Sequence, residues 1–212
     1  MNQKHNRIAT FVRLPLYRNY LLSLNPMPEY ISAASIASAL NFGEVQVRKD
    51  LACICDGGRP RIGYVTAQLL ASLDDVLNRR GSGEAVLVGA GKLGSALLDY
   101  SGFAGYGIEI VAGFDCAVAR IGETAGGKPV YSVEELEDFC QQHRIRIGII
   151  TVPAFCAQKI CDRLVSLGIR AIWCFAPIRL NAPDDIIIRY ENLAASLGSL
   201  TAQLDGLGGD AE

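Results

Sequence analysis

The sequence predicts an α/β protein: an N-terminal winged helix-turn-helix domain, then a Rossmann dinucleotide-binding domain with a C-terminal dimerisation helix. Three observations support this fold class. A glycine fingerprint follows an apolar run at residues 85–88, and an acidic residue follows the last fingerprint glycine by about 20 positions. Two short helical patterns flank a tight turn at residues 41–43.

The fingerprint lies between a predicted strand at residues 85–88 and a predicted helix that includes residues 95–98. This order indicates a dinucleotide site, because the glycines permit a tight turn, close approach of a pyrophosphate and close helix packing. Free amides at the helix start would hold the phosphates. A glycine-rich packing turn is the alternative. The predicted cofactor-binding residues here are Gly89, Ala90, Gly91, Lys92, Leu93 and Gly94.

A second predicted strand, residues 108–114, ends in Asp115. An acid at this point suits the two ribose hydroxyls of NAD and repels the extra phosphate of NADP. Asp115 also favours an adenosine ribose over coenzyme A, which remains a possible ligand of a similar fold.

The rest of this domain alternates between predicted helices and strands. Residues 132–143 predict a helix opened by a capping box, Pro153 begins another helix that Gly168 ends, and strands are expected at 146–152, 171–175 and 185–190. Ligands of such sheets bind beyond the carboxyl ends of the strands. The predicted residues on the nicotinamide side are therefore Thr151, Val152, Pro153 and Phe175.

The first 80 residues predict a helical domain. A helix is expected at 15–24 with Pro15 in its first turn, and Ser32 is expected to cap a helix at 33–40. The third helix, 44–54, turns Val47, Leu51 and Ile54 toward a core and leaves Gln46, Lys49, Asp50 and Cys53 outward, with Arg48 on the flank.

Two short helices around a turn, the second with basic and amide side chains outward, predict DNA binding, with a small helical docking domain as the alternative. The basic stretch 57–64 predicts a wing, and a fourth helix is expected at 66–80. The predicted DNA-binding residues are Ser32, Gln46, Arg48, Lys49, Arg59 and Arg61.

Composition agrees with a DNA-binding protein. Residues 1–80 carry ten Lys and Arg against six Asp and Glu, whereas the remainder carries ten against sixteen. A basic segment joined to an acidic one indicates that the first meets a polyanion. Seven cysteines without a C-x-x-C pair favour neither a disulfide framework nor a zinc site, so we expect no metal and a reducing cytoplasm. Neither a secretory signal nor a membrane-spanning run is expected.

These patterns predict a winged-helix domain at 1–80, a Rossmann NAD(H)-binding domain at 84–190, a C-terminal helix at 191–205 and a tail at 206–212. The C-terminal helix carries a leucine stripe that packs either on its own domain or on a second copy. The stripe consists of Leu193, Leu197, Leu200 and Leu204.

Several strings occur together in a characteristic order: R-L-P-L-Y at 13–17, V-Q-V-R-K-D-L at 45–51, the fingerprint, G-F-D at 113–115, G-I-I-T-V-P-A at 148–154 and C-F-A-P-I-R-L-N at 174–181. Over residues 12–204 the chain resembles the bacterial redox-sensing transcriptional repressor Rex family. The resemblance implies a homodimer with exchanged C-terminal helices and a palindromic double-stranded DNA operator that is released when NADH displaces NAD+. It also implies that Tyr100 lies near the nicotinamide and that Arg48 and Lys49 contact DNA.

The chain departs from the family pattern in two places. The family usually reads S-Y-F-G and further glycines after the recognition helix, where this chain has A-C-I-C-D-G-G-R-P-R at 52–61. An Arg of the first helix and an Asp at the start of the last helix are replaced by Asn19 and Asn192. A regulator with weakened or lost NADH sensing is therefore one alternative function.

Two further alternatives are a small NAD-dependent oxidoreductase and a thiol sensor that uses Cys53 and Cys55. The enzyme is disfavoured because the only histidines are His5 and His143 and no catalytic domain remains beyond the nucleotide fold. The sequence therefore predicts a regulator and not an enzyme. The thiol sensor is disfavoured because cysteines two positions apart point away from each other on a helix.

Overall fold

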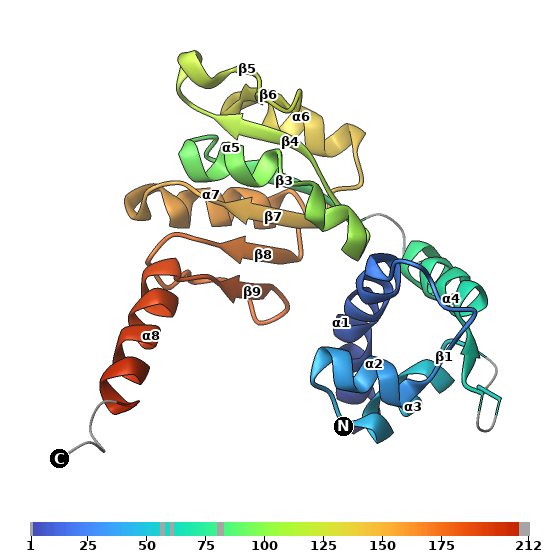
Figure 1. The fold of residues 1–212 in the computed structure, drawn as a ribbon. Coiled ribbons are helices and arrows are strands. Elements are labelled where there is room, and N and C mark those ends of the chain that lie inside the picture. Colours follow the sequence, from blue (N-terminus) through green and yellow to red (C-terminus); the bar gives the residue numbers. More distant parts are fainter. Residues whose placement is uncertain (1, 56–57, 60–61, 80–82, 208–212) are drawn as a thin grey trace. The chain divides into compact units, whose positions relative to one another are not determined.

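A computed structural model of the chain describes residues 2–55, 58–59, 62–79 and 83–207 (Figure 1). The chain divides into two compact units. Unit 1 comprises Met1–Ser82 together with Gly102–Gly107, and unit 2 comprises Gly83–Ser101 with Ile108–Glu212. The short segment Gly102–Gly107 thus groups with unit 1, although it interrupts the sequence of unit 2.

Unit 1 is a helical domain with a small two-stranded sheet. Its elements are α1 (Asn2–Ser23), β1 (Tyr30–Ile31), α2 (Ala33–Leu40), α3 (Glu44–Ala52), β2 (Tyr64–Val65) and α4 (Thr66–Arg79). β1 and β2 pair antiparallel, with Tyr30 opposite Val65. The core is formed by apolar side chains from all four helices: Leu14, Tyr17, Leu21, Ile36, Val47, Leu51, Leu69 and Leu73.

The turn between α2 and α3 forms as the sequence predicts. The Ser32 hydroxyl oxygen accepts a hydrogen bond from the Ser35 amide at 2.9 Å and caps α2. Asn41 ends α2 in the left-handed region with φ of 55°. An asparagine tolerates this conformation, and the three residues 41–43 turn the chain before α3 begins.

Two expectations for unit 1 are wrong. Helix α1 begins at Asn2, so Pro15 lies inside it and not in its first turn. Proline in a helix removes one backbone hydrogen bond and crowds the preceding turn. Burial of the neighbouring Leu14 and Tyr17 outweighs this cost. Asp50 was expected to face outward on α3, but it is only 3% exposed, because it forms an ion pair with Arg13 of α1.

Unit 2 is a seven-stranded sheet with the strand order β5-β6-β4-β3-β7-β8-β9. Its pairs are parallel except for β5 with β6. Without β5 this is the Rossmann order, in which the first strand, β3, lies between β4 and β7. The strands are β3 (Gly83–Val88), β4 (Ile108–Asp115), β5 (Gly122–Glu123), β6 (Pro129–Ser132), β7 (Ile147–Ile150), β8 (Ala171–Cys174) and β9 (Ile187–Tyr190).

Most helices of unit 2 lie where the sequence predicts them. Its helical elements are α5 (Lys92–Leu98), η2 (Val118–Arg120), η3 (Val133–Glu135), α6 (Leu136–Gln142), α7 (Ala154–Ser166) and α8 (Leu193–Leu207). η1 (Ser101–Tyr106) falls almost entirely in the segment that groups with unit 1. The capping box at Ser132 is confirmed: the Ser132 hydroxyl oxygen accepts from the Glu134 amide at 3.3 Å, and Glu135 Oε1 accepts from the Ser132 amide at 3.0 Å. η3 and α6 together occupy the helix predicted at 132–143. β5, β6, η1 and η2 were not predicted, since each is too short to show a hydrophobic period.

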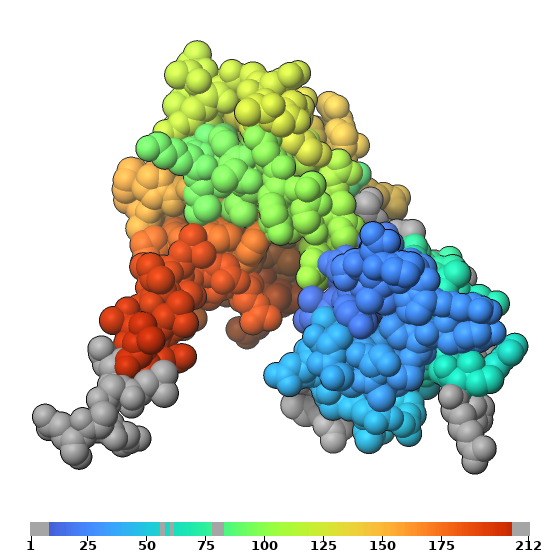
Figure 2. Space-filling model, viewed as in Figure 1, coloured from blue at the N-terminus to red at the C-terminus, as the bar shows by residue number. Residues whose placement is uncertain are grey.

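α8 follows β9 and extends beyond the edge of the sheet of its own unit (Figures 1 and 2). Its four stripe leucines are exposed by 54–68%. Among the described residues, no helix combines the length and the apolarity required to cross a membrane.

Candidate dinucleotide and nucleic-acid sites

The loop after β3 is built so that only glycine fits at two positions. Gly89 has φ of 106°, and a Cβ there would lie 2.8 Å from the carbonyl carbon of Thr151. A Cβ on Gly94 would lie 2.0 Å from the carbonyl oxygen of Gly89. The start of α5 therefore packs directly on the loop.

α5 begins at Lys92 with Gly91 as its N-cap residue, and the amide of Ser95 makes an early helical bond to the Gly91 carbonyl at 2.8 Å. The first amides of a helix have no carbonyl partner within it. They lie here at the carboxyl end of β3, where the helix dipole adds partial positive charge. Ala90 is buried, whereas the Lys92 and Leu93 side chains are exposed. The backbone of this segment, more than its side chains, is suited to phosphate groups.

Asp115 ends β4 beside this loop and is 4% exposed. Its Oδ1 accepts from the Ala117 amide at 2.9 Å, and its Oδ2 accepts from Arg120 Nη1 at 3.0 Å. Burial alone would raise the pKa of this carboxyl, but the bonds from Ala117 and Arg120 outweigh burial and hold the pKa below its ordinary value. Asp115 is therefore an anionic acceptor at the position where a ribose would lie.

Sequence reasoning missed Arg120. It lies in the short segment η2, and its guanidinium is 3.8 Å from the Cβ position of Gly91. The Arg120 side chain is 52% exposed. It links Asp115 to the glycine loop through the turn of η2, which no sequence motif marks.

The residues expected on the nicotinamide side lie at the ends of β7 and β8. The Thr151 hydroxyl donates to the carbonyls of Val88 at 3.1 Å and Gly89 at 2.8 Å, which joins β7 to the glycine loop. Val152 follows it, and Pro153 caps α7. The Phe175 ring packs edge-on against Trp173 with centroids 4.5 Å apart.

Tyr100 lies beyond the last residue of α5, at the other end of that helix from Gly91. Its side chain is 59% exposed. The structure therefore places Tyr100 apart from the glycine loop of its own unit, and its approach to a nicotinamide stays a prediction.

In unit 1, α3 carries the predicted DNA-contacting side chains. Gln46, Arg48 and Lys49 are all exposed on it. Arg48 forms an ion pair with Glu44 one turn earlier. Ser32 is engaged as the cap of α2, so its hydroxyl is already committed to Ser35.

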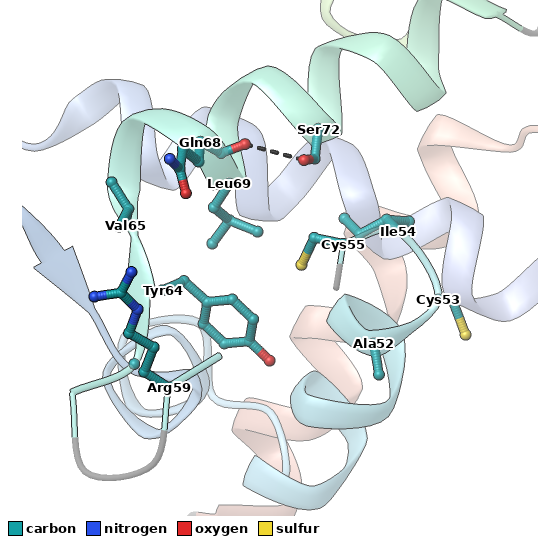
Figure 3. A pocket seen from close by; sticks show the side chains of 11 residues that line it. Ala52, Cys53, Ile54, Cys55, Arg59, Tyr64, Val65, Gln68, Leu69 and Ser72 are labelled. Carbon is teal, nitrogen blue, oxygen red and sulfur yellow. Dashed lines mark hydrogen bonds between the residues drawn. The ribbon is translucent and has the colours of Figure 1, made fainter. Parts of the chain in front are cut away.

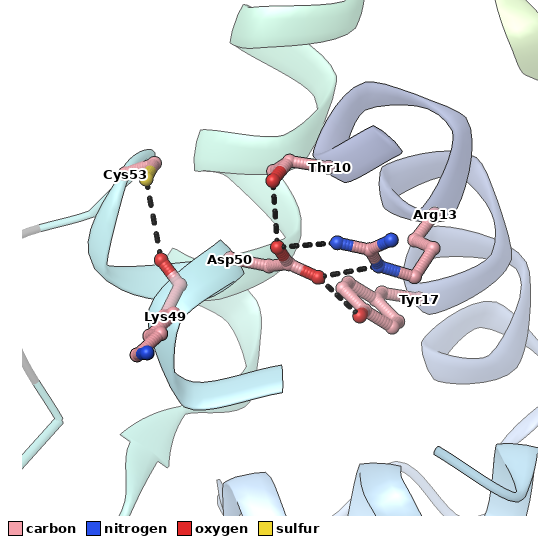
Figure 4. Close-up of polar contacts among 6 residues, drawn as sticks. All are labelled: Thr10, Arg13, Tyr17, Lys49, Asp50 and Cys53. Atoms are coloured by element: carbon pink, nitrogen blue, oxygen red, sulfur yellow. Dashed lines mark hydrogen bonds and ion pairs between the residues drawn. The ribbon is translucent and has the colours of Figure 1, made fainter. Parts of the chain in front are cut away.

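A buried polar cluster fixes α3 against α1 (Figure 4). Asp50 accepts from Arg13 Nε at 2.7 Å and Nη2 at 2.8 Å, and from the hydroxyls of Thr10 and Tyr17 at 2.7 Å each. Burial alone would raise the pKa of Asp50, but these bonds outweigh it and lower the pKa, so the carboxylate is charged at neutral pH. Burial and the bond to Asp50 raise the pKa of Tyr17, so its hydroxyl stays a donor.

The predicted wing is partly described. Arg59 pairs with Gly63 in an antiparallel bridge, and the Arg59 amide donates to the Gly63 carbonyl at 2.8 Å. Arg61 lies outside the described residues. Arg59, Tyr64 and Cys55 line a cavity of about 610 Å³ between the end of α3 and α4 (Figure 3).

Cys53 and Cys55 do not face each other. Their sulfur atoms point in different directions (Figure 3), and each thiol donates to a helix carbonyl, Cys53 to Lys49 and Cys55 to Leu51. This geometry gives no support to a disulfide between them. Within the part of the chain that the structure describes, no cluster of three His, Cys, Asp or Glu residues is arranged to hold a metal ion.

The two asparagines at the departures from the family pattern are both exposed. Asn192 caps α8, since its Oδ1 accepts from the Ala195 amide at 2.9 Å. Asn19 lies on α1, and its Oδ1 is 3.4 Å from the Cβ position of Gly105 within the same unit.

Comparison with known families and proteins agrees with this geometry. A family model described as "CoA binding domain" matches residues 81–178, and one described as "Putative DNA-binding protein N-terminus" matches residues 8–52. The chain is 36% identical over 197 residues to the redox-sensing transcriptional repressor Rex of Bacteroides fragilis, covering 92% of this chain and 90% of that protein. It is 38% identical over 193 residues to Rex of a Roseiflexus species, covering 91% and 88%.

Two solved structures of one repressor, RSP, have the same fold. The crystal structure of RSP in complex with β-NAD+ and operator DNA has a TM-score of 0.78 and 32% identity, covering 97% of this chain and 98% of that one. The RSP complex with β-NADH has a TM-score of 0.75 and 33% identity, covering 94% of each chain.

Proposed function

The chain belongs to the Rex family of redox-sensing transcriptional repressors, and we propose that it represses transcription by binding operator DNA according to the NADH/NAD+ ratio, with NADH favouring release. The observation that carries this function is the presence, in one chain, of a glycine loop with a buried acid beside it and a helix with exposed basic side chains. The RSP repressor has been crystallised both with NAD+ and operator DNA and with NADH.

For the cofactor we assign NAD(H). The residues present fit it: the loop from Gly89 to Gly94 leaves room for a pyrophosphate, and Asp115 offers carboxylate oxygens to ribose hydroxyls. Thr151, Val152, Pro153 and Phe175 then border the nicotinamide half, with Tyr100 nearby in the assembled repressor. When bound, the cofactor supplies only its redox state as a signal.

For DNA, we assign Arg48, Lys49 and Gln46 on α3 as the contacts of the recognition helix, with Arg59 and Arg61 on the wing and Ser32 at the start of α2. Positively charged side chains fix the protein on the phosphates, and the recognition helix reads base edges. The free cysteines and the DNA partner support a cytoplasmic location.

We assign a homodimer that forms through α8. Four leucines exposed on one helix form an apolar stripe whose contact with water is unfavourable, and in the proposed dimer a second copy of the chain covers it. A two-fold dimer presents two α3 helices to two half-sites, so we expect a palindromic operator with half-sites about 34–36 Å apart or a multiple of that distance.

The test is selection of random DNA duplexes by the pure protein in NAD+ and in NADH. We expect a palindromic sequence that is retained with NAD+ and lost with NADH. The oxidoreductase alternative is tested by NADH turnover on a panel of carbonyl substrates, where a repressor shows none. Asymmetric half-sites, or steady turnover, would contradict the proposal.

A second candidate is a repressor with weakened or lost NADH sensing, which is favoured by the replacement of both the family's Arg and its Asp, here by Asn19 and Asn192. A hydrogen bond between neutral groups contributes about 0.5–1.5 kcal/mol, against about 1.5–3 for one that includes a charge. A ligand shifts a two-state equilibrium only by its differential affinity for the two states.

Operator binding would be titrated with NADH and NAD+ in the wild type and in the Asn19→Arg, Asn192→Asp double variant. The second candidate predicts weak release in the wild type and sharper release in the variant. Sharp release by the wild type, unchanged in the variant, would reject it.

A further inference from the structure

The carboxamide of Gln46 is held by the arginine that binds Asp50. With its oxygen facing α1, the amide accepts from Arg13 Nη1 at 2.9 Å and lies 3.2 Å from Nε, whose single hydrogen is donated to Asp50. The reverse orientation would turn the amide N–H groups toward the guanidinium N–H groups, donor against donor. The oxygen of Gln46 therefore belongs on the side of Arg13.

Arg13 is a rigid support for this contact. Its Nε and Nη2 bind the two oxygens of Asp50, and the two side chains are only 15% and 4% exposed. Thr10 and Tyr17 also donate to that carboxylate (Figure 4). A guanidinium turning away would leave a buried charge alone, which is strongly unfavourable.

Gln46 is nevertheless exposed on α3. It lines a groove between α1 and α3 together with Arg13 and Lys49, three residues further along α3. The groove thus places the Gln46 amide beside Arg13, which is paired with Asp50, and beside the exposed Lys49. This setting suits an electron-rich oxygen of DNA.

A glutamine in a recognition helix ordinarily reads adenine with both amide groups, donating to N7 and accepting from the N6 amino group. Here the amide oxygen points toward Arg13 on α1, and an amide held in this way cannot also direct both its oxygen and its N–H groups at one adenine. We propose that Gln46 contacts the operator as a hydrogen-bond donor only, toward a phosphate oxygen or the O6/N7 acceptors of guanine, and that Arg13 is the positioning residue that sets this polarity. The inference rests on the proposed DNA-binding function.

The test uses the full-length protein and the duplex it selects. Each adenine is replaced in turn by nebularine, which lacks the N6 amino group, and affinity is measured for the wild type and for Gln46→Ala. We expect Gln46→Ala to weaken binding by about threefold to tenfold, which is the loss expected for one hydrogen bond. The ratio of the wild-type affinity to the Gln46→Ala affinity should be the same for the natural duplex and for each duplex that lacks one adenine N6 amino group.

The two acceptor sources are separated in the same series. A phosphate contact gives a loss that is uniform across all base substitutions. A guanine contact gives a loss that vanishes at one guanine replaced by 2-aminopurine, which lacks O6, or by 7-deazaguanine, which lacks N7. The inference would be overturned by an adenine whose replacement with nebularine weakens binding of the wild type but leaves the affinity of Gln46→Ala unchanged. Unchanged binding by Gln46→Ala would overturn it as well.

Gln46→Glu supplies a second readout. Glutamate keeps an acceptor for Arg13 but has no N–H group, so binding should fall at least as far as in Gln46→Ala. Gln141→Ala, at an exposed glutamine of α6, is the matched control and should bind as the wild type does. If the wild type selects no duplex, the proposed function fails. If the wild type selects an operator, but loss of one adenine N6 amino group weakens binding of the wild type and not of Gln46→Ala, the proposed function stands and only the inference fails.

Discussion

Removal of the Asp50 carboxylate should destabilise unit 1 more than any other single loss of charge. In Asp50→Ala, four hydrogen bonds of 2.7–2.8 Å disappear, two of them from Arg13. Arg13 is 15% exposed and Tyr17 is fully buried, so water reaches the abandoned donors poorly. Leaving one partner of a buried ion pair alone costs about 3–5 kcal/mol. At about 4–8 °C per kcal/mol for a domain of this size, Tm should fall by more than about 10 °C.

The assay is thermal unfolding followed by calorimetry, with Asp74→Ala as the matched control. Asp74 also pairs with an arginine of α1, Arg18, but the two side chains are 38% and 28% exposed. An ion pair so accessible to solvent contributes less than about 1 kcal/mol. Equal losses in the two variants, or a loss below about 1 kcal/mol for Asp50→Ala, would refute the argument that burial of the pair holds α3 on α1.

Four further outcomes are expected. The wild type should bind NADH more tightly than NADPH by calorimetric titration, and Asp115→Ala should weaken NADH binding by about 1–3 kcal/mol; equal affinities for the two nucleotides would contradict the assignment. Glu44→Gln should strengthen operator binding and steepen its salt dependence, because it frees Arg48 and removes an anion near DNA; unchanged binding would mean that Arg48 is not a contact. Leu197→Glu should convert the dimer to monomer by sedimentation, whereas an intact dimer would place the interface elsewhere. Because folding lowers the pKa of Asp50, the stability it contributes is present above about pH 4 and is lost as pH falls through the folded pKa; acid titration of Asp50→Asn should show a smaller loss, and equal loss would exclude the carboxylate as the cause.

Features that depend on neighbours in sequence were predictable. The cap at Ser32, the left-handed Asn41 and the capping box at Ser132 follow from short-range hydrogen bonding, and the structure has all three. The strand-glycine-helix order around Gly89 likewise determines a local geometry. The Rossmann strand order then follows, since right-handed crossovers leave few alternatives.

Features that depend on distant partners were not predictable. Helical periodicity places an acid such as Asp50 in solvent, because an unpaired buried carboxylate is costly. Its partner Arg13 is 37 residues away, and the sequence gives no sign of the pairing. Arg120 was missed for a related reason, since its role depends on a turn of three residues that brings it back to Asp115.

α1 shows how far such partners can change the interpretation of a helix. From the sequence alone this helix was expected to begin at Pro15, which leaves Arg13 outside it. In the fold, Arg13 supports α3 and the amide of Gln46, while Arg18 binds Asp74 of α4, 56 residues away. Asn19 lies beside Gly105, in the segment that follows Tyr100. Helix α1 thus contacts both α3, the proposed recognition helix, and the segment that follows the proposed nicotinamide contact. Substitutions that test redox sensing at Asn19 must therefore be shown to leave the Arg13–Asp50 pair intact.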